Sequence, residues 1–472
     1  MRTQWVSKAS KALRGRGVES MGNRAPNERL AGLHRETGWT LRQFAQAVNR
    51  IGTECGTPTT YSAQTAHSWL KGHIPATPEV RQLVIEALAR KLKRPVSHTD
   101  VGFPVPEGRA NGSAGISTVE ELAALGRLDM DPSRRSVVGA SLFSTALSVP
   151  VWSDVAGRLA AIPSGKTQRI GMPDVELVAD VTRRFHELDH ERGGRVARAS
   201  AASFLVDIVV PHLKAEGPEA VRRAMMSAAS ELCYLIGYMA VDEGLHGTAQ
   251  SYYIKALELA GAAEDKSAHC LTLHGMSSQA VHLGHGTAAL RLADAAAGSA
   301  PGASPNMRAH LAAQQAYSAA VAGERVNAVA FMRRTENSMS HAEPESGRVV
   351  VGKFSSATFS YYVAQVKYSL GDTSGSIAAM KEYIPSLGGD SWLRRRVLDT
   401  ARLAHRQLES GHLEEACATW HESLNGYSRV RSGRCDDKIR DMFSMIRPHL
   451  KNRVARELYE RAREVAPNSL VA

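Results

Sequence analysis

The sequence lacks several motifs that mark enzymes and secreted proteins. Its five cysteines are scattered, odd in number and without a C-x-x-C pair, so neither a disulfide framework nor a zinc ribbon is expected. A G-x-x-x-x-G-K loop for nucleotide phosphates and a G-x-S-x-G turn for a nucleophilic serine are also missing. We therefore predict a protein that is not an enzyme, needs no cofactor or metal, and keeps reduced thiols in the cytoplasm.

Aromatic residues and long apolar runs are scarce as well. Aromatics make up only 6% of the chain and β-branched runs are few, which favours an all-α fold. No uncharged apolar run opens the chain, so we expect no secretory signal and no membrane partner. One internal segment, Ser133–Trp152, resembles a twin-arginine export signal. Such signals act at an N-terminus, so a buried helix that docks two halves of the chain is the favoured interpretation.

Positive charge is concentrated at one end of the chain. The first hundred residues hold 16 Lys and Arg against 7 Asp and Glu, a net charge of +9, whereas the whole chain carries +11. A basic block confined to one segment is typical of contact with the phosphates of nucleic acid. The alternative is a solvated basic tail with no partner.

The composition divides the chain into five predicted segments. A linker is expected where proline and glycine are frequent and apolar residues are few, as at Pro104, Pro106 and Gly108. The true start is open between Met1 and Met21. The segments are a basic flexible arm (1–24), a helix-turn-helix DNA-binding domain (25–96), a linker (97–118), bridging helices (119–171) and a tetratricopeptide-like helical repeat domain (172–472).

Apolar spacing predicts four helices between Asn27 and Leu92. The first stops near Gly38. The second begins with a capping box, because Thr40 is suited to cap it and Gln43 follows three residues later. Residues 49–60 are polar and rich in glycine, so they are expected to form a loop.

The next helix, Ser62–Lys71, has the pattern of a helix that enters the major groove of DNA. Ala66, Trp69 and Leu70 form an apolar back, and short polar side chains lie near its start. Gln64 is suited to pair with adenine, Lys71 with a phosphate or guanine, and Arg42 with a phosphate. For each, the alternative is an exposed side chain without a contact. The predicted DNA-contacting residues are Thr40, Arg42, Gln43, Ser62, Ala63, Gln64, His67, Ser68 and Lys71.

The C-terminal part carries an internal period. Glycines recur at positions 244, 284, 323, 371 and 411, and small or apolar pairs such as Ala249 and Tyr253 follow at similar offsets. This spacing predicts an α-solenoid, whose concave surface binds peptides, proteins or small ligands. Several tyrosines are suited to line such a groove, although packing between helices is the alternative for most of them. They are Tyr234, Tyr238, Tyr252, Tyr253, Tyr361 and Tyr362, of which Tyr234, Tyr238 and Tyr253 are the main candidates.

Two histidine groups look like metal sites. His186 to His190 match H-E-x-x-H, but the third histidine of the longer zincin motif would fall at Val196, and Asp189 is unusual for a zinc helix. The second group has a spacing that matches no common site. It comprises His269, Cys270, His274, His282 and His285.

Four stretches of the chain resemble one family. They are Trp69-Leu70-Lys71-Gly72 with Pro75, Glu86–Val96, Asp100–Phe103, and Phe185–Gly194. Together they resemble actinobacterial helix-turn-helix regulators, which are related to the XRE-like phage repressors. The resemblance implies that the third helix reads bases, through Ser62, Ala63, Gln64, His67 and Ser68. It also implies regulation of transcription, in several cases of sporulation and secondary metabolism.

These observations predict a cytoplasmic, nucleoid-associated regulator that binds double-stranded DNA, with paired half-sites suited to a homodimer. Its repeat domain is expected to dimerise and to sense a peptide, protein or small molecule. The alternative is a tetratricopeptide-type adaptor without sequence-specific DNA binding.

Overall fold

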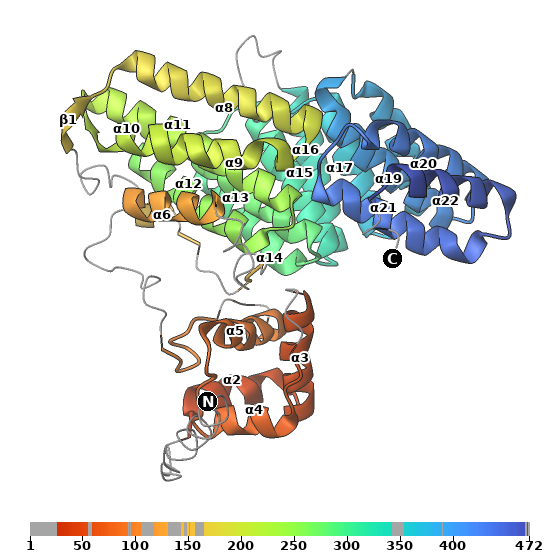
Figure 1. Cartoon of the computed structure of the whole chain (residues 1–472), viewed down its shortest axis with the longest axis horizontal. Helices are drawn as coiled ribbons and strands as arrows, with labels where there is room; N and C mark the ends of the chain where they lie inside the picture. The colour runs from red at the N-terminus through yellow and green to blue at the C-terminus, as the bar shows by residue number, and fades with distance from the viewer. Residues whose placement is uncertain are drawn as a thin grey trace, which may run out of the picture.

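The computed structural model describes residues 26–54, 59–92, 94, 96–104, 118–130, 143–145, 149–150, 152–155, 165–341, 354–388, 390–467 and 470. Most of these residues are helical, which confirms the predicted all-α fold with helical repeats. Within the described ranges the strands are β1 (Gly165–Arg169) and β2 (Ala215–Glu216), which pair in parallel. Figure 1 shows a small N-terminal bundle beside a long array of helices.

The N-terminal bundle contains four helices around a core of its own. They are α2 (Glu28–Thr37), α3 (Leu41–Glu54), α4 (Ala63–Leu70) and α5 (Pro78–Leu92). Phe44, Val48 and Leu88 are fully buried there. Helix α2 ends at Gly38, whose φ of +66° is the left-handed conformation that glycine adopts without strain, as the sequence predicted.

Two expectations for this bundle are wrong. The loop predicted over residues 49–60 begins later, because Ile51 extends the buried face of Phe44 and Val48 and α3 continues to Glu54. The predicted linker also begins later than residue 97. Val101 and Phe103 are buried in the bundle's core, and Nδ2 of Asn27 donates to the Val101 carbonyl at 2.8 Å. Residues 105–117 lie outside the described part.

The array consists of stacked antiparallel helix pairs. Each of the five recurring glycines lies in the turn of one pair, with φ between +78° and +87°, which confirms the predicted period. The pairs are α11 (Glu219–Asp242) with α12 (His246–Ala262), α13 (Lys266–His282) with α14 (Gly286–Ser299), α15 (Pro305–Val321) with α16 (Arg325–Ser340), α17 (Ser356–Ser369) with α18 (Thr373–Tyr383), and α19 (Leu393–Glu409) with α20 (Leu413–Tyr427).

Further elements flank these pairs. Among residues 119–171, where bridging helices were predicted, β1 is a strand and not a helix. The other elements are α6 (Thr118–Met130), α7 (Trp152–Val155), α8 (Met172–Arg192), α9 (Gly194–Phe204), the π-helix η3 (Leu205–Val209), α10 (Val210–Lys214), α21 (Gly433–Ile446), α22 (Arg453–Val465), and the 3₁₀ turns η4 (Ile384–Ser386), η5 (Asp390–Trp392) and η6 (Arg447–His449).

The array curls so that α8 contacts α19 and the start of α21. The backbone N–H of Arg431 donates to the Arg192 carbonyl at 2.6 Å, and a Cβ added at Gly193 would overlap the Arg431 carbonyl. Asp189 of α8 accepts a hydrogen bond from Arg394 of α19 at 2.7 Å. Asp189, Arg192 and Gly193, which belong to the stretch Phe185–Gly194, therefore make contacts between helices that are distant in the sequence.

Two helical stretches, Gly194–Lys214 and Glu219–Asp242, are long and apolar enough to span a membrane by length and composition. In the second, 72% of the apolar window is buried inside the protein. This stretch is α11, which packs against α8, α9 and α12. A helix that is apolar on all sides can be a membrane span or a buried core helix, and α11 is a core helix of the array in this structure.

The predicted docking helix at Ser133–Trp152 lies mostly outside the described residues. Its residues 143–145 are described, are not helical, and lie between α5 and α12. The Thr145 amide donates to Glu86 of α5 at 2.9 Å, and the Ser144 amide donates to Gln250 of α12 at 2.8 Å. This short segment therefore connects the bundle to the array, on the side where α5 faces it in Figure 1.

Candidate DNA interface and candidate ligand hollow

Helix α4 has one buried face, and that face determines which side chains point outward. Ala66 and Trp69 are 0% and 4% exposed. The Trp69 ring makes edge contacts with Phe44 of α3 and with Tyr61, at centroid distances of 6.1 and 5.2 Å. Because α4 is held against α3 through these rings, its opposite face is open to solvent.

The structure places all nine predicted DNA-contacting residues at the surface of the bundle. Ala63 and Ser68 are partly exposed. The others are exposed: Thr40, Arg42, Gln43, Ser62, Gln64, His67 and Lys71. Ser62 caps α4 by accepting from the Thr65 amide at 3.3 Å. Ser68 donates to the Thr65 carbonyl at 2.7 Å, so its hydroxyl proton is used within the helix.

The predicted capping box at the start of α3 is present. The Thr40 amide donates to Oε1 of Gln43 at 2.9 Å, and the Gln43 amide donates to Oγ1 of Thr40 at 3.3 Å. These two bonds, donated by backbone N–H groups, occupy the acceptor oxygens of both side chains. The side-chain NH₂ group of Gln43 is left free to donate hydrogen bonds, and a phosphate oxygen can accept them.

Sequence reasoning missed the side chain that fixes the turn between α3 and α4. Oδ1 of Asn49 accepts from the Tyr61 amide at 2.7 Å and from the Thr59 hydroxyl at 3.0 Å, and Nδ2 donates to the Tyr61 carbonyl at 2.9 Å. One asparagine therefore pins the end of the turn to α3. A lone Asn inside a predicted loop gave no signal of this role.

The three main groove tyrosines have different roles. Tyr253 is 1% exposed and packs between α11 and α12, where a Cβ added at Gly237 would lie 2.8 Å from its ring. Tyr234 likewise packs against Gly275 of α13. These two residues fill the gaps that small residues leave between helices, which is the packing role that the sequence left open as the alternative. Tyr238 lines a hollow.

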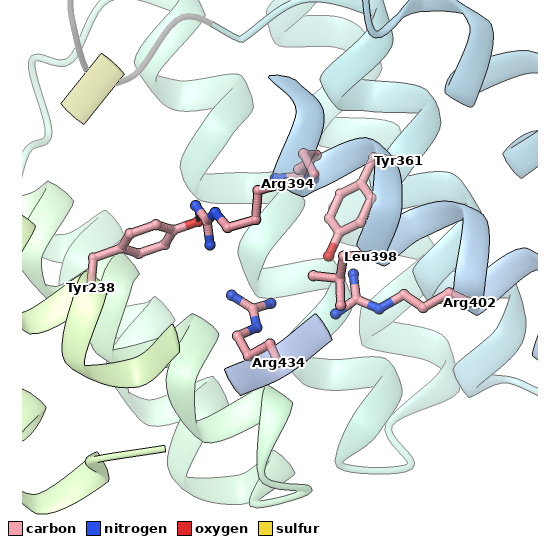
Figure 2. Close-up of a pocket in the computed structure, with 7 residues that line it drawn as sticks. Tyr238, Tyr361, Arg394, Leu398, Arg402 and Arg434 are labelled. Atoms are coloured by element: carbon pink, nitrogen blue, oxygen red, sulfur yellow. Dashed lines mark hydrogen bonds between the residues drawn. The ribbon is translucent and has the colours of Figure 1, made fainter. Parts of the chain in front are cut away.

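This hollow is small and lies where four helices of the array meet. It is lined by Tyr238 of α11, Tyr361 of α17, Arg394, Arg395, Leu398 and Arg402 of α19, and Arg434 of α21. Figure 2 shows the guanidinium groups of Arg394, Arg402 and Arg434 pointing toward one another, with Arg394 beside the Tyr238 hydroxyl and Arg402 near Tyr361. Sequence reasoning missed these arginines, because their clustering depends on how α21 folds back toward α11.

Three buried carboxylates partner the arginines of the hollow. Arg394 donates to Asp242 at 2.9 Å and to Asp189 at 2.7 Å. Asp399 accepts from Arg395 at 3.0 Å and from Arg402 at 2.7 Å. Nε of Arg434 is buried and finds no hydrogen-bond partner among the described residues. Four guanidinium groups thus face three carboxylates.

The Tyr238 hydroxyl responds to this positive charge. Burial alone would raise the pKa of the Tyr238 hydroxyl, but Arg394 and Arg434 outweigh it and lower the pKa below its ordinary value. The hollow therefore favours negative charge.

The histidines of the two groups pack against neighbouring rings, and among them His269 and His274 are buried. His186 and His190 lie 4.3 Å apart by ring centroid, and burial lowers the pKa of His186 to about 4. His274 shares a hydrogen bond with the Tyr362 hydroxyl at 3.0 Å. Across the described ranges there is no group of three or more His, Cys, Asp or Glu residues that could hold a metal ion.

Comparison with known proteins identifies one segment. Residues 30–104 match a family described as the SP15 N-terminal domain. The match begins in α2 and ends just after Phe103, so it covers the bundle's buried core. No curated protein and no solved structure matches the chain.

Proposed function

We propose that the protein is a transcriptional regulator that binds double-stranded DNA through the N-terminal bundle. The observation that carries the proposal is the division of helix α4 into two faces. Trp69 is buried on the face that packs against α3, whereas Gln64, His67 and the following Lys71 are exposed to solvent. A helix with this division, packed on a second helix, is suited to the major groove. The basic first hundred residues supply the attraction to phosphates.

The outward residues divide into base-reading and backbone-positioning groups. Gln64 has the amide that pairs with adenine N6 and N7 in a bidentate manner. Lys71 at the end of α4 and Arg42 at the start of α3 are exposed cations suited to phosphates. Two copies of the chain, each with one such helix, would read paired half-sites.

The helix array is proposed to dimerise and to bind an effector. An effector changes DNA binding only if it binds one arrangement of the two parts more tightly than the other. Residues 143–145 touch both α5 and α12, so a change in the array has a direct route to the bundle. The resemblance to actinobacterial regulators extends the proposal to control of differentiation or secondary metabolism inside the cytoplasm.

The test combines one double variant with its matched control. Gln64→Ala with Lys71→Ala should weaken binding to the protein's own operator by about 10- to 100-fold, since a good base contact contributes about 1–3 kcal/mol. The operator is first identified by genome-wide crosslinking in the native host, and affinity is then measured by fluorescence anisotropy. The control is Lys451→Ala, which removes one exposed charge at the C-terminal end of the array, outside the bundle, and should leave the affinity for DNA unchanged.

Two results would contradict the proposal. Equal affinity of the double variant and the wild type would show that α4 does not contact DNA as assigned. A flat crosslinking profile for the wild type would favour the adaptor, whose N-terminal bundle binds protein.

A further inference from the structure

The hollow between α11, α17, α19 and α21 is a built cationic site. Arg394 is held rigidly, because its Nε, Nη1 and Nη2 atoms all donate hydrogen bonds, to the Asp189 carbonyl, Asp242 and Asp189. Its guanidinium lies over the Tyr238 ring at 5.2 Å, and that of Arg395 lies over the Tyr361 ring at 4.2 Å. Arginines stacked on tyrosines and fixed by carboxylates are preorganised before any ligand arrives.

The other arginines keep donors for a ligand. The hydrogen bonds within the described part use Nε of Arg395 and Nη1 of Arg402. Each guanidinium has five N–H donors, so both retain several that are not engaged there. Arg434 adds a third group, whose buried Nε lacks a partner among the described residues. A buried charged donor without a partner is costly, and an anion in the hollow would satisfy it.

Size and charge narrow the class of anion. The hollow is far smaller than the pockets of about 300–1,000 Å³ that hold drug-sized ligands, so it fits only one compact group. A phosphate group carries more negative charge than a carboxylate and offers three acceptor oxygens to guanidiniums on different sides. Arginine is favoured for phosphate recognition because its planar fork binds two oxygens at once.

We propose that this hollow binds the phosphate group of a small effector molecule, held by Arg395, Arg402 and Arg434 between Tyr238 and Tyr361. The inference rests on the proposed function in one respect, namely that the bound molecule acts as an effector of DNA binding. The site itself is independent of DNA. It joins helices from both ends of the curled array, so a bound anion would stabilise the closed arrangement of α11, α19 and α21.

Binding is tested with the full-length protein by isothermal titration calorimetry in a chloride buffer at constant ionic strength. The probes are inorganic phosphate and pyrophosphate, with succinate as a dicarboxylate of similar size. We expect saturable binding of a phosphate probe and at least tenfold weaker binding of succinate. Arg434→Gln should reduce phosphate affinity at least tenfold, and it leaves no carboxylate without its partner. Arg402→Gln is the second variant, because Arg395 still partners Asp399.

Arg453→Gln on the exposed face of α22 is the matched control and should bind phosphate as the wild type does. Circular dichroism and gel filtration confirm that each variant is folded. The proposal is overturned if the wild type shows no saturable phosphate binding, if Arg434→Gln binds equally well, or if succinate binds as tightly.

DNA affinity is measured separately, with and without pyrophosphate. Arg434→Gln should keep its affinity for DNA in phosphate-free buffer but lose the effect of pyrophosphate. If Arg434→Gln loses DNA binding itself, the hollow contacts the DNA backbone and the effector inference is wrong. If the wild type binds pyrophosphate but no DNA, the proposed function fails while the anion site stands. If it binds DNA but no phosphate probe, only the anion site fails.

Discussion

Replacing Arg394 with leucine is expected to lower the free energy of unfolding of the array by about 3–5 kcal/mol, the usual cost of leaving buried carboxylates unpaired. Arg394, Asp189 and Asp242 are 3%, 0% and 0% exposed. The arginine therefore compensates two carboxylates that water does not reach. It also connects α19 to α8 and α11, so its loss removes the charge pairing that closes the array.

The pH dependence of the free energy of unfolding distinguishes a loss caused by unpaired carboxylates from a loss caused by poorer packing. Burial raises the pKa of Asp189 to about 6, although Arg394 lowers it and Asp242 raises it further. Without Arg394 this pKa rises again, whereas in the unfolded chain it is about 3.9. Between pH 7 and pH 5 the folded variant then binds protons that the unfolded chain does not. Its stability must increase as the pH falls, and the deficit relative to the wild type must shrink.

Urea unfolding at pH 7, 6 and 5 measures this deficit. Arg394→Leu combined with Asp189→Asn and Asp242→Asn should recover much of the loss, because no buried charge remains. Arg453→Leu, which breaks an ion pair whose side chains are 87% and 54% exposed, should cost no more than about 1 kcal/mol. A deficit that is the same at all three pH values would instead point to lost packing around the leucine.

Local patterns predicted the elements of this protein well. The capping box of Thr40 and Gln43, the stop at Gly38 and the turn glycines each depend on a few neighbouring residues, so the sequence contains their whole explanation. The same holds for the inward face of α4, where Ala66 and Trp69 follow helical spacing.

The hollow was not predictable in the same way. Arg394 and Arg434 are 40 positions apart and face Tyr238, which lies more than 150 positions earlier in the chain. Their meeting depends on the curvature of the array, to which every helix pair contributes a small rotation. Tyrosines gave a misleading signal for a related reason. Tyr253 and Tyr238 are both on the first repeat, but only the geometry of Gly237 shows that Tyr253 fills a packing gap.

Replacing Trp69 with alanine should unfold the bundle, and with it abolish the proposed DNA binding, while the array stays folded. Removing a buried tryptophan costs about 3–5 kcal/mol. A small domain has a total stability of about 5–15 kcal/mol, so this loss is a large share of it. Trp69 contacts both Phe44 and Tyr61, so the same change also releases α4 from α3. The bundle's core contains no residue of the repeat pairs, so its loss removes no packing from them.

Hydrogen exchange followed by mass spectrometry separates the two parts. Amides of α2–α5 should exchange much faster in Trp69→Ala, and amides of α11–α20 should exchange at the wild-type rate. Trp392→Ala is the matched control, since Trp392 is 41% exposed in the array and contacts His190. It should leave the bundle protected. Faster exchange in α12 of Trp69→Ala would show that the contacts of residues 143–145 with Glu86 and Gln250 make the two cores unfold together. The same contacts would then couple the two parts in both directions, so that binding of an effector to the array would change the stability of the bundle.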